Sequence, residues 1–359
     1  MSAQRVTTIP VRSAAGRYRV VFDRGGIERL DRHVRPVLPS ERVVVVSGAT
    51  VAALHATRAL AALQRARLRP ELIVTPAGEP AKTLESARRL YEQLADLRVD
   101  RSTGVIALGG GVVGDLAGFV AATYLRGLPL IHVPTTTLAQ ADAAIGGKTA
   151  VDLPAGKNLV GAFHAPRLVL ADTDTLATLP ERHLRAGLAE VAKVAFTIEP
   201  ALLRGLEGRF DLERALVAAA RAKARIVSAD EKERGRRMVL NYGHTVGHAL
   251  EALGGYKRWL HGEAVAHGIQ AAARIATLTG VGSEAWEARQ WALLEMLGLG
   301  GEFPRVSIAK LLTYMSLDKK ARAGVPVFVL TARVGVVRVR RSLSVDTVTR
   351  ALASLGAQP

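Results

Sequence analysis

The order of hydrophobic patterns along the chain constrains its fold more than any other feature. In the first half, short β-branched runs such as residues 42–47 (RVVVVS) and 104–108 (GVIAL) alternate with amphipathic helical stretches such as residues 82–97. From about Leu179 onward the pattern changes to long helical periodicity. Strands that alternate with helices predict a mostly parallel sheet covered by helices, and sustained helical periodicity predicts a mainly helical region.

This change of pattern predicts two domains. We expect residues 1–178 to form an α/β N-terminal domain with a mostly parallel, Rossmann-like sheet, and residues 179–359 to form a mainly α-helical C-terminal domain. Further strands are expected at residues 71–75, 129–133 and 167–172, and a small hairpin at residues 325–341. There is no internal repeat and no low-complexity linker.

Composition limits the chemistry and the partners. Because the chain has no cysteine, it forms no disulfide, and any metal has to be held by His, Asp or Glu. The net charge is +17, but the basic residues are scattered and aromatic residues make up only 4%, so we expect no nucleic-acid partner. No apolar run approaches the roughly 20 residues of a membrane span, and the N-terminus lacks a signal-peptide pattern. We therefore expect a cytoplasmic protein with no membrane partner.

The two basic residue types are used unequally. The chain has ten lysines and 39 arginines. Lysine offers a compact ammonium where arginine offers a planar fork, so a lysine kept in such a chain points to a site that needs a point charge.

A glycine-rich loop follows the strand at residues 104–108. It reads GGGVVGD and contains G-x-G-x-x-G at Gly109, Gly111 and Gly114. Such loops let backbone N–H groups approach a pyrophosphate at a helix N-terminus. The match departs from the dinucleotide fingerprint, because the loop follows about the fourth strand and no acidic residue ends the next one. A tight turn that binds nothing is the alternative for the loop alone.

Polar groups at neighbouring strand ends favour a nucleotide. Glu79 and Lys82 follow the strand at residues 71–75 and could meet ribose hydroxyls and a phosphate, respectively, and PTTT at residues 134–137 follows the strand after the glycine loop. In an open α/β sheet these strand ends meet at one edge, where ligands bind.

A second glycine-rich segment, residues 139–163, contains two of the ten lysines. Lys148 and Lys157 suit phosphate as point charges, and Asp142 and Asn158 lie in the same segment. A solvated loop without a ligand is the alternative.

Two histidines of the stretch LNYGHTVGHALE are four residues apart. His244 and His248 therefore share one face of a predicted helix, and Asn241 is expected on that face one turn earlier. His261 and Glu263 begin the next helical stretch, whose N-terminus could pack against this face. A surface or capped core histidine is the ordinary alternative for a single helical histidine.

An acid–base pair and several glycines strengthen the functional interpretation. Glu190 and Lys193 share a face otherwise made of small apolar residues, where an ordinary helix ion pair is the alternative. Glycines at 243, 247 and 262 each adjoin a histidine, although helix interiors disfavour glycine by about 1 kcal/mol. They predict close backbone approach. A carboxylate with two imidazoles is a donor set expected of catalytic zinc.

Several long motifs in register resemble the 3-dehydroquinate synthase family across nearly the whole chain. They are GGGVVGDLAGFVAATYLRG, VPTTTLAQADAAIGGKTAVDLPAGKNLVGAF, TLPERHLRAGLAEVAK, LNYGHTVGHALEA, LHGEAVAHG and DKK. The resemblance implies a homodimer that uses NAD and Zn²⁺ or Co²⁺. It implies conversion of the sugar acid phosphate 3-deoxy-D-arabino-heptulosonate 7-phosphate to 3-dehydroquinate in the shikimate pathway. The implied steps are oxidation at C5, phosphate elimination, reduction and aldol ring closure, with no net redox change.

The resemblance also implies roles for individual residues. The implied metal ligands are Glu190, His244 and His261. The implied substrate pocket comprises Asp142, Lys148, Asn158, Lys193, Lys223, Arg237, Asn241, His248 and Lys319 or Lys320, with Arg126 from the other subunit. The implied NAD site comprises Glu79, Lys82, Gly111, Val112, Val113, Gly114, Asp115, Thr135, Thr136, Lys148, Lys157, Thr175, Leu176, Ala177 and Thr178. His267 is implied to be structural.

Departures from the family pattern are mild. The chain has Ala192, Val194, Tyr242 and His267 where the family often has other residues, and none of these is an implied ligand. Metal-dependent alcohol dehydrogenases share a GGG loop and an HxxxH helix but lack the GGKTAVDLP and GKNL segments. Cyclases that make inosose, valiolone or aminodehydroquinate are closer alternatives; Lys223 and Arg237, suited to a carboxylate, argue against the first two only. A binding protein that kept the fold without activity is a further alternative.

Overall fold

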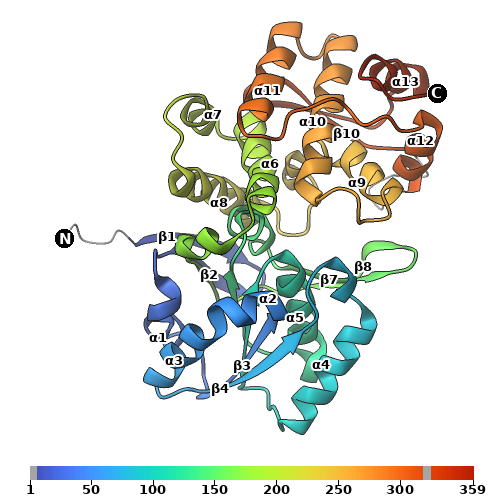
Figure 1. Ribbon diagram of the computed structural model, residues 1–359. Coiled ribbons are helices and arrows are strands. Elements are labelled where there is room, and N and C mark those ends of the chain that lie inside the picture. The colour runs from blue at the N-terminus through green and yellow to red at the C-terminus, as the bar shows by residue number, and fades with distance from the viewer. Residues whose placement is uncertain (1–5, 318–324) are drawn as a thin grey trace. The chain divides into compact units, whose positions relative to one another are not determined.

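The computed structural model describes residues 6–317 and 325–359 (Figure 1). The chain forms two compact units. The first comprises residues up to Pro180 together with Lys223–Lys232, and the second comprises Glu181–Ala222 and Glu233–Pro359. Residues 223–232 thus group with the first unit, whereas the sequence pattern placed them in the second domain. The functional domain boundary at residue 178 stays a prediction.

A seven-stranded sheet forms the centre of the first unit, in the order β1-β2-β9-β6-β5-β3-β4. All its pairs are parallel except β1 with β2. The predicted mostly parallel sheet is confirmed, and the antiparallel edge pair is an addition to it. The strands are β1 (Thr7–Ser13), β2 (Gly16–Phe22), β3 (Arg42–Gly48), β4 (Arg69–Thr75), β5 (Gly104–Gly109), β6 (Leu130–Pro134) and β9 (Leu168–Ala171).

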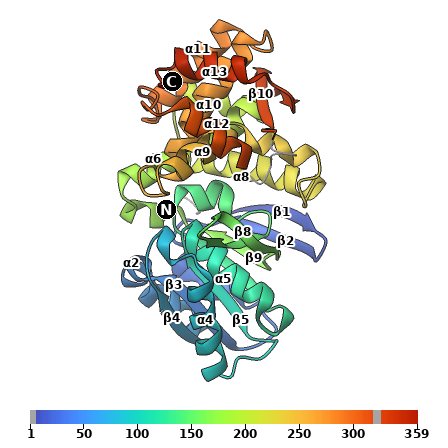
Figure 2. The same ribbon diagram turned by 90° about the vertical axis from the view of Figure 1, so that its right-hand side faces the viewer.

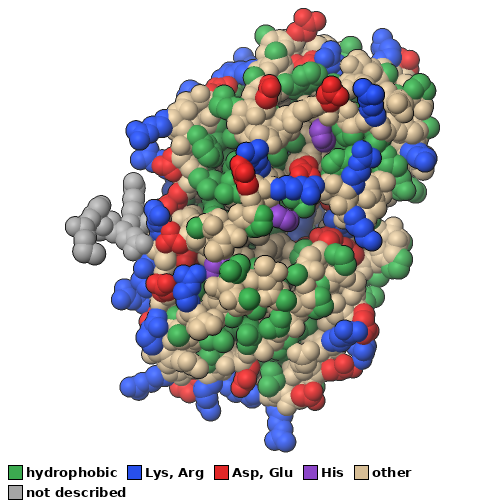
Figure 3. Space-filling model, in the orientation of Figure 1, with side chains coloured by type: hydrophobic (Ala, Val, Ile, Leu, Met, Phe, Trp, Pro, Cys, Tyr) green, Lys and Arg blue, Asp and Glu red, His purple; other side chains and the backbone are tan. Residues whose placement is uncertain are grey.

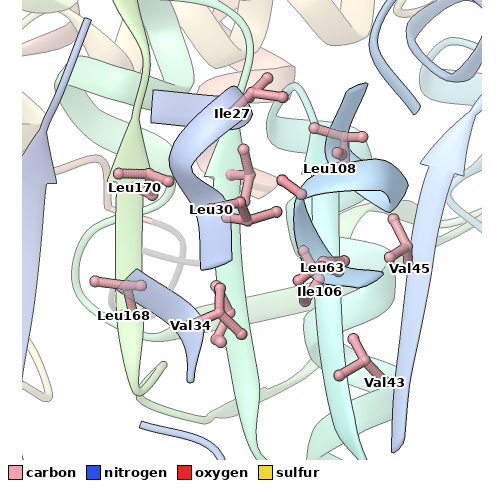
Figure 4. Packing of buried hydrophobic residues seen from close by; sticks show 14 of the residues in the cluster. Ile27, Leu30, Val34, Val43, Val45, Leu63, Ile106, Leu108, Leu168 and Leu170 are labelled. Atoms are coloured by element: carbon pink, nitrogen blue, oxygen red, sulfur yellow. The ribbon is translucent and has the colours of Figure 1, made fainter. Parts of the chain in front are cut away.

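Helices cover both faces of this sheet because its central strands are apolar on both sides. Val43 and Val45 of β3 pack with Leu63 on one face (Figure 4), whereas Val44 and Val46 pack on the other. This alternation follows from the two-residue period of a strand. The first face is covered by α1 (Leu30–Val34) and α3 (Thr57–Arg65), and the second by α4 (Leu84–Asp96) and α5 (Gly111–Thr123). Short helical segments connect these elements: η1 (Gly26–Arg29), α2 (Ala49–Val51), η2 (Ala52–Ala56), η3 (Glu79–Ala81), η4 (Tyr124–Arg126), η5 (Ala139–Ala143) and η6 (Thr173–Thr178).

The second glycine-rich segment is more ordered than the sequence suggested. Most of it forms an antiparallel hairpin of β7 (Lys148–Leu153) and β8 (Gly156–Phe163). At Gly161 a Cβ atom would lie 2.3 Å from the backbone oxygen of Thr149, so glycine permits the close pairing of the two strands. The alternative of a solvated loop therefore does not describe this segment.

The second unit is mainly helical, as predicted. Its elements are α6 (Glu181–Thr197), α7 (Pro200–Glu207), the first part of α8 (Leu212–Ala229), η7 (Arg236–Asn241), α9 (His244–Leu253), α10 (His261–Leu278), α11 (Glu284–Met296), α12 (Ile308–Leu317) and α13 (Val345–Ser354). The hairpin predicted at residues 325–341 is present as β10 (Phe328–Arg333) and β11 (Val336–Arg340). Across the described residues, none of the helices combines the length and apolar character needed to cross a membrane.

Glycines let α10 approach its neighbours closely. A Cβ atom at Gly262 would lie 1.7 Å from the backbone oxygen of Ala186 in α6, and one at Gly268 would lie 1.8 Å from that of Gly243, next to α9. In Figures 1 and 2, α9 and α10 lie side by side. The close backbone approach predicted from the glycines beside the histidines is confirmed.

Candidate active site

Three side chains of the second unit converge from three helices. Glu190 lies on α6, His244 begins α9 and His261 begins α10. The Nε2 atoms of both imidazoles lie 3.6 Å from the same oxygen, Oε1 of Glu190. The three candidate ligand atoms all lie within 4.8 Å of one another. The structure therefore brings together the three residues predicted to bind the metal.

The Nδ1 atoms of the two rings face oxygen atoms. His244 Nδ1 lies 3.1 Å from the backbone oxygen of Tyr242, and His261 Nδ1 lies 3.0 Å from Oε2 of Glu251. An Nδ1–H group that donates to such an oxygen leaves the Nε2 lone pair for a metal. Both histidines are thus oriented with Nε2 toward Glu190.

Burial and charge suit a cation at this cluster. Glu190 is 1% exposed, and Lys193, one turn further along α6, contacts its other oxygen. Burial alone would lower the pKa of His261, but the carboxylates of Glu251 and Glu190 outweigh it and raise that pKa to about 10. Two imidazoles and one carboxylate form a donor set that fits a divalent metal such as zinc and leaves coordination positions for substrate.

His248 also lies in this cluster. Its ring centroid is 5.2 Å from that of His244 and 6.1 Å from that of His261. A second possible ligand group, formed by His248, Glu251 and His261, also has its ligand atoms within 4.8 Å of one another. The predicted role of His248 as a substrate contact stays a prediction.

Asn241 is placed differently from the expectation. It ends η7 and is separated from α9 by Gly243, whose φ of 79° interrupts the helix. Its side chain donates a hydrogen bond to Glu233, a residue that the sequence analysis missed. Asn241 therefore does not share the helical face of His244 and His248.

Three further predictions concern the second unit. Arg237 lies in η7 and is buried. His267 Nδ1 lies 2.9 Å from Oε1 of Gln270, and its ring packs edge-on against Phe303, which suits the structural role implied for it. Lys319 and Lys320 lie outside the described residues.

Lysines and carboxylates of the first unit form a second cluster. Lys82 is 3% exposed, and its Nζ atom lies 2.5 Å from Oδ2 of Asp115 and also donates to Oδ1 of Asn158. Lys157 lies 3.0 Å from Glu79. The structure thus joins four residues predicted for NAD with one predicted for the substrate.

The pKa values in this cluster reflect burial and pairing. Burial acts to lower the pKa of Lys82, but the negative charges of Asp115 and Glu79 outweigh it, so the pKa is raised and the ammonium is retained. Burial raises the pKa of Asp115 even though Lys82 acts in the opposite direction. Asp152, which the sequence analysis did not select, accepts a hydrogen bond of 2.8 Å from the backbone N–H of Asn158.

The glycine loop leads into α5 as predicted. Gly110 is the N-cap of this helix, and a Cβ atom there would lie 3.0 Å from the side chain of Thr136. A small gap beside the loop is lined by Gly114 and His132, among others. Gly111, Val112, Val113 and Gly114 open the helix, Thr135 is buried, and Thr175, Leu176, Ala177 and Thr178 lie in η6. The end of β4, which precedes Glu79, is separated from β5 by β3.

Lys223 is also held by a carboxylate of the first unit. Its Nζ atom lies 2.9 Å from Oδ1 of Asp142 and 2.6 Å from the backbone oxygen of that residue. Lys148 is exposed at the start of β7. Cationic groups predicted to hold substrate are therefore present at the surface and in the interior of this unit.

Arg126 is exposed at the end of η4, after the apolar helix α5. An apolar helix of this kind could either line a subunit interface or pack within its own chain. In the structure, the helix residues from Leu116 to Ala121 are buried within their own unit, against the sheet and β7. The apolar pattern is thus explained by the fold of a single chain and does not itself require a partner.

The chain has an α/β unit with a glycine loop, followed in sequence by a helical unit with a His–His–Glu cluster. This combination is typical of enzymes that use both a nucleotide cofactor and a metal ion. Residues 72–186 match the model of the 3-dehydroquinate synthase N-terminal region, and residues 187–321 match that of the C-terminal region. The 3-dehydroquinate synthase of Symbiobacterium thermophilum is 47% identical over 94% of this chain and 98% of the relative. That of Pelobacter propionicus is 45% identical over 92% and 94%, respectively. The chain belongs to the 3-dehydroquinate synthase family.

Solved structures agree with this assignment. A 2-deoxy-scyllo-inosose synthase complexed with carbaglucose-6-phosphate, NAD⁺ and Co²⁺ is 27% identical, with a TM-score of 0.85 over 96% of this chain and 99% of that one. The 2-epi-5-epi-valiolone synthase of Streptomyces hygroscopicus, with NAD⁺ and Zn²⁺ bound, is 28% identical, with the same TM-score over 94% and 96%. A glycerol dehydrogenase of Schizosaccharomyces pombe, at 17% identity and a TM-score of 0.65, shares the fold.

Proposed function

We propose that the chain is a 3-dehydroquinate synthase, which converts 3-deoxy-D-arabino-heptulosonate 7-phosphate to 3-dehydroquinate and phosphate. The convergence of Glu190, His244 and His261 in a member of this family is the observation that carries the proposal. Relatives that are 45–47% identical over more than nine-tenths of the chain are named 3-dehydroquinate synthase. The named inosose and valiolone synthases are less similar, at 27–28% identity.

NAD and a divalent cation, Zn²⁺ or Co²⁺, are the proposed cofactors. When bound, they supply hydride transfer and Lewis-acid stabilisation of oxygen atoms on the substrate. Glu190, His244 and His261 would hold the cation. The glycine loop, Lys82 and Glu79 would hold NAD, and the helix N-terminus at Gly111 offers backbone N–H groups that suit phosphate.

The protein's own groups would bind and orient a polyanionic substrate. Lys223 and Arg237 are proposed to hold the carboxylate, and Lys148, Asn158 and His248 the phosphate, where Arg126 also contributes. Pairing of Lys223 with Asp142 fixes the direction of its ammonium before substrate arrives. Lys193 beside Glu190 places a proton donor at the proposed cation site. Part of the net charge of +17 would attract the substrate; Figure 3 shows Lys and Arg side chains spread over the visible face.

Phosphate release tests this function directly. Purified protein with NAD, zinc and the heptulosonate phosphate should release phosphate in large molar excess over the NAD supplied. NADH should not accumulate, because the reaction has no net redox change. His244→Ala, which lacks a proposed metal ligand, is the matched inactive control. NADH formed in proportion to product would show a dehydrogenase instead.

A homodimer with Arg126 reaching the partner's substrate phosphate is also proposed. Losing a charge-assisted contact to phosphate should lower kcat/KM by roughly thirtyfold to thousandfold, or about 2 to 4 kcal/mol. Mixing Arg126→Ala with His244→Ala subunits should then restore activity, since a mixed dimer has one complete site. Mixed dimers that form but stay inactive would place the action of Arg126 within its own chain.

A further inference from the structure

Glu251 is a buried carboxylate beside His261 that has no part in the proposed function. It lies on α9, seven residues after His244, so the two share one face of the helix. It is 3% exposed, and its Oε2 atom lies 3.0 Å from Nδ1 of His261. Burying a carboxylate is costly unless it is paired or hydrogen-bonded, so its place beside an imidazole calls for a physical reason.

We propose that Glu251 is a positioning residue for the cation site. It accepts a hydrogen bond from the Nδ1–H group of His261, which directs the Nε2 atom of that ring toward Glu190. It also adds a second buried negative charge to that of Glu190, which favours a divalent cation. The inference rests on the proposed function only in taking this cluster as the cation site.

The two histidines differ in the acceptor that orients them. His244 faces a neutral backbone oxygen, that of Tyr242, whereas His261 faces a carboxylate. A hydrogen bond to a carboxylate is the stronger of the two and makes the ring a better electron donor. Loss of Glu251 should therefore weaken the site through His261 while leaving all three ligands in place.

The distances favour this role over direct ligation by Glu251. Two ligand atoms about 2.1 Å from one tetrahedral metal are about 3.4 Å apart. The separations of 3.6 Å from Glu190 Oε1 to the two Nε2 atoms agree with that value. The 3.0 Å between Glu251 and His261 Nδ1 is instead the length of an ordinary hydrogen bond.

Metal affinity measured without substrate tests the proposal. In competition with a chromophoric chelator, Glu251→Leu should bind Co²⁺ and Zn²⁺ about tenfold to a hundredfold more weakly than the unmodified protein. Glu251→Gln, which keeps an acceptor oxygen but loses the charge, should weaken binding less. Both variants should keep the shape of the Co²⁺ absorption spectrum, because the three ligands remain. If Glu251→Leu does not fold, the Glu251→Gln affinity decides.

Glu287→Gln is the matched control, since Glu287 is a buried acid of the same unit that pairs with Arg274 at 2.8 Å. It should keep normal metal affinity even if it lowers stability. Unchanged affinity in a folded Glu251→Leu protein would overturn the proposal. So would complete metal loss in Glu251→Gln with metal retained in Glu190→Gln, which would make Glu251 itself a ligand. Metal binding without phosphate release would count only against the proposed reaction.

Discussion

The histidine cluster of the second unit and the lysine cluster of the first unit are built in different ways. The histidine cluster is built on helices, which carry Glu190, His244 and His261. The backbone of α10 lies in direct contact with the backbone of its neighbours. Lys82 and Lys157 lie on a strand-end connection and on a hairpin strand, respectively. A metal needs ligand positions fixed to a fraction of an ångström, which packed helices provide, whereas the first unit presents these lysines on a short connection and a hairpin.

The clusters also differ in charge. In the first unit each of the lysines 82, 157 and 223 already faces a carboxylate. A phosphate that binds there competes with these partners. In the second unit, Glu190 faces two imidazoles and one lysine, and Glu251 adds a second carboxylate beside His261. In the first cluster each of these lysines is thus already paired with a carboxylate. In the second, two carboxylates lie beside imidazoles that could bind a cation.

The difference in packing predicts the largest effect on stability. Gly262→Ala should lower the free energy of unfolding by about 4 kcal/mol or more, because the added Cβ would meet the backbone of α6 at 1.7 Å. Gly114→Ala is the matched change in the first unit, where the Cβ would meet His132 at 3.4 Å, an ordinary contact. It should change stability by less than about 1 kcal/mol. Urea unfolding followed by circular dichroism measures both, and equal effects would remove the contrast in packing.

The dependence of stability on pH should distinguish His132 of the first unit from His261 of the second. Burial lowers the pKa of His132 to about 4, in contrast to the raised pKa of His261. In the unfolded chain His132 takes up a proton near pH 6.5, whereas in the folded protein it does so only near pH 4. The stabilisation is therefore fully present above pH 6.5 and is lost as the pH drops toward 4. The loss amounts to about 3 kcal/mol. His132→Gln should remove this part of the pH dependence, whereas the exposed His183→Gln should not. An unchanged pH dependence of stability in His132→Gln would show that His132 does not cause the loss of stability in acid.

The pre-paired lysine cluster predicts a smaller effect, on cofactor affinity. Lys82→Met should weaken NAD binding by roughly tenfold to a hundredfold, because the proposed charge-assisted contact to phosphate would be lost and the carboxylate of Asp115 would lose its cationic partner. Lys310→Met, on an exposed part of α12, is the control and should bind NAD normally. Isothermal titration calorimetry gives both affinities. Normal NAD binding by Lys82→Met would show that Lys82 is not part of the cofactor site.

Sequence periodicity predicted most of the helices and strands, for a local reason. The spacing of His244 and His248 fixes their helical face, and the apolar runs of β3 and β5 identify buried strands. The roles of Glu251 and Glu233 depend on partners brought near by tertiary folding, so spacing alone did not reveal them. The β7–β8 hairpin was missed because glycines that permit close strand pairing look like loop residues in a sequence.

The metal content of two histidine variants tests which side chains of the histidine cluster bind the metal. His261→Ala removes a proposed ligand, whereas His248→Ala removes a neighbouring ring whose centroid lies 6.1 Å away. Both proteins, stripped with a chelator and reconstituted with zinc, can be compared by atomic absorption after dialysis. We expect His261→Ala to retain no stoichiometric zinc, and His248→Ala to retain the wild-type amount and lose turnover. Equal loss of zinc from both variants would contradict the assignment of Glu190, His244 and His261 as the metal ligands.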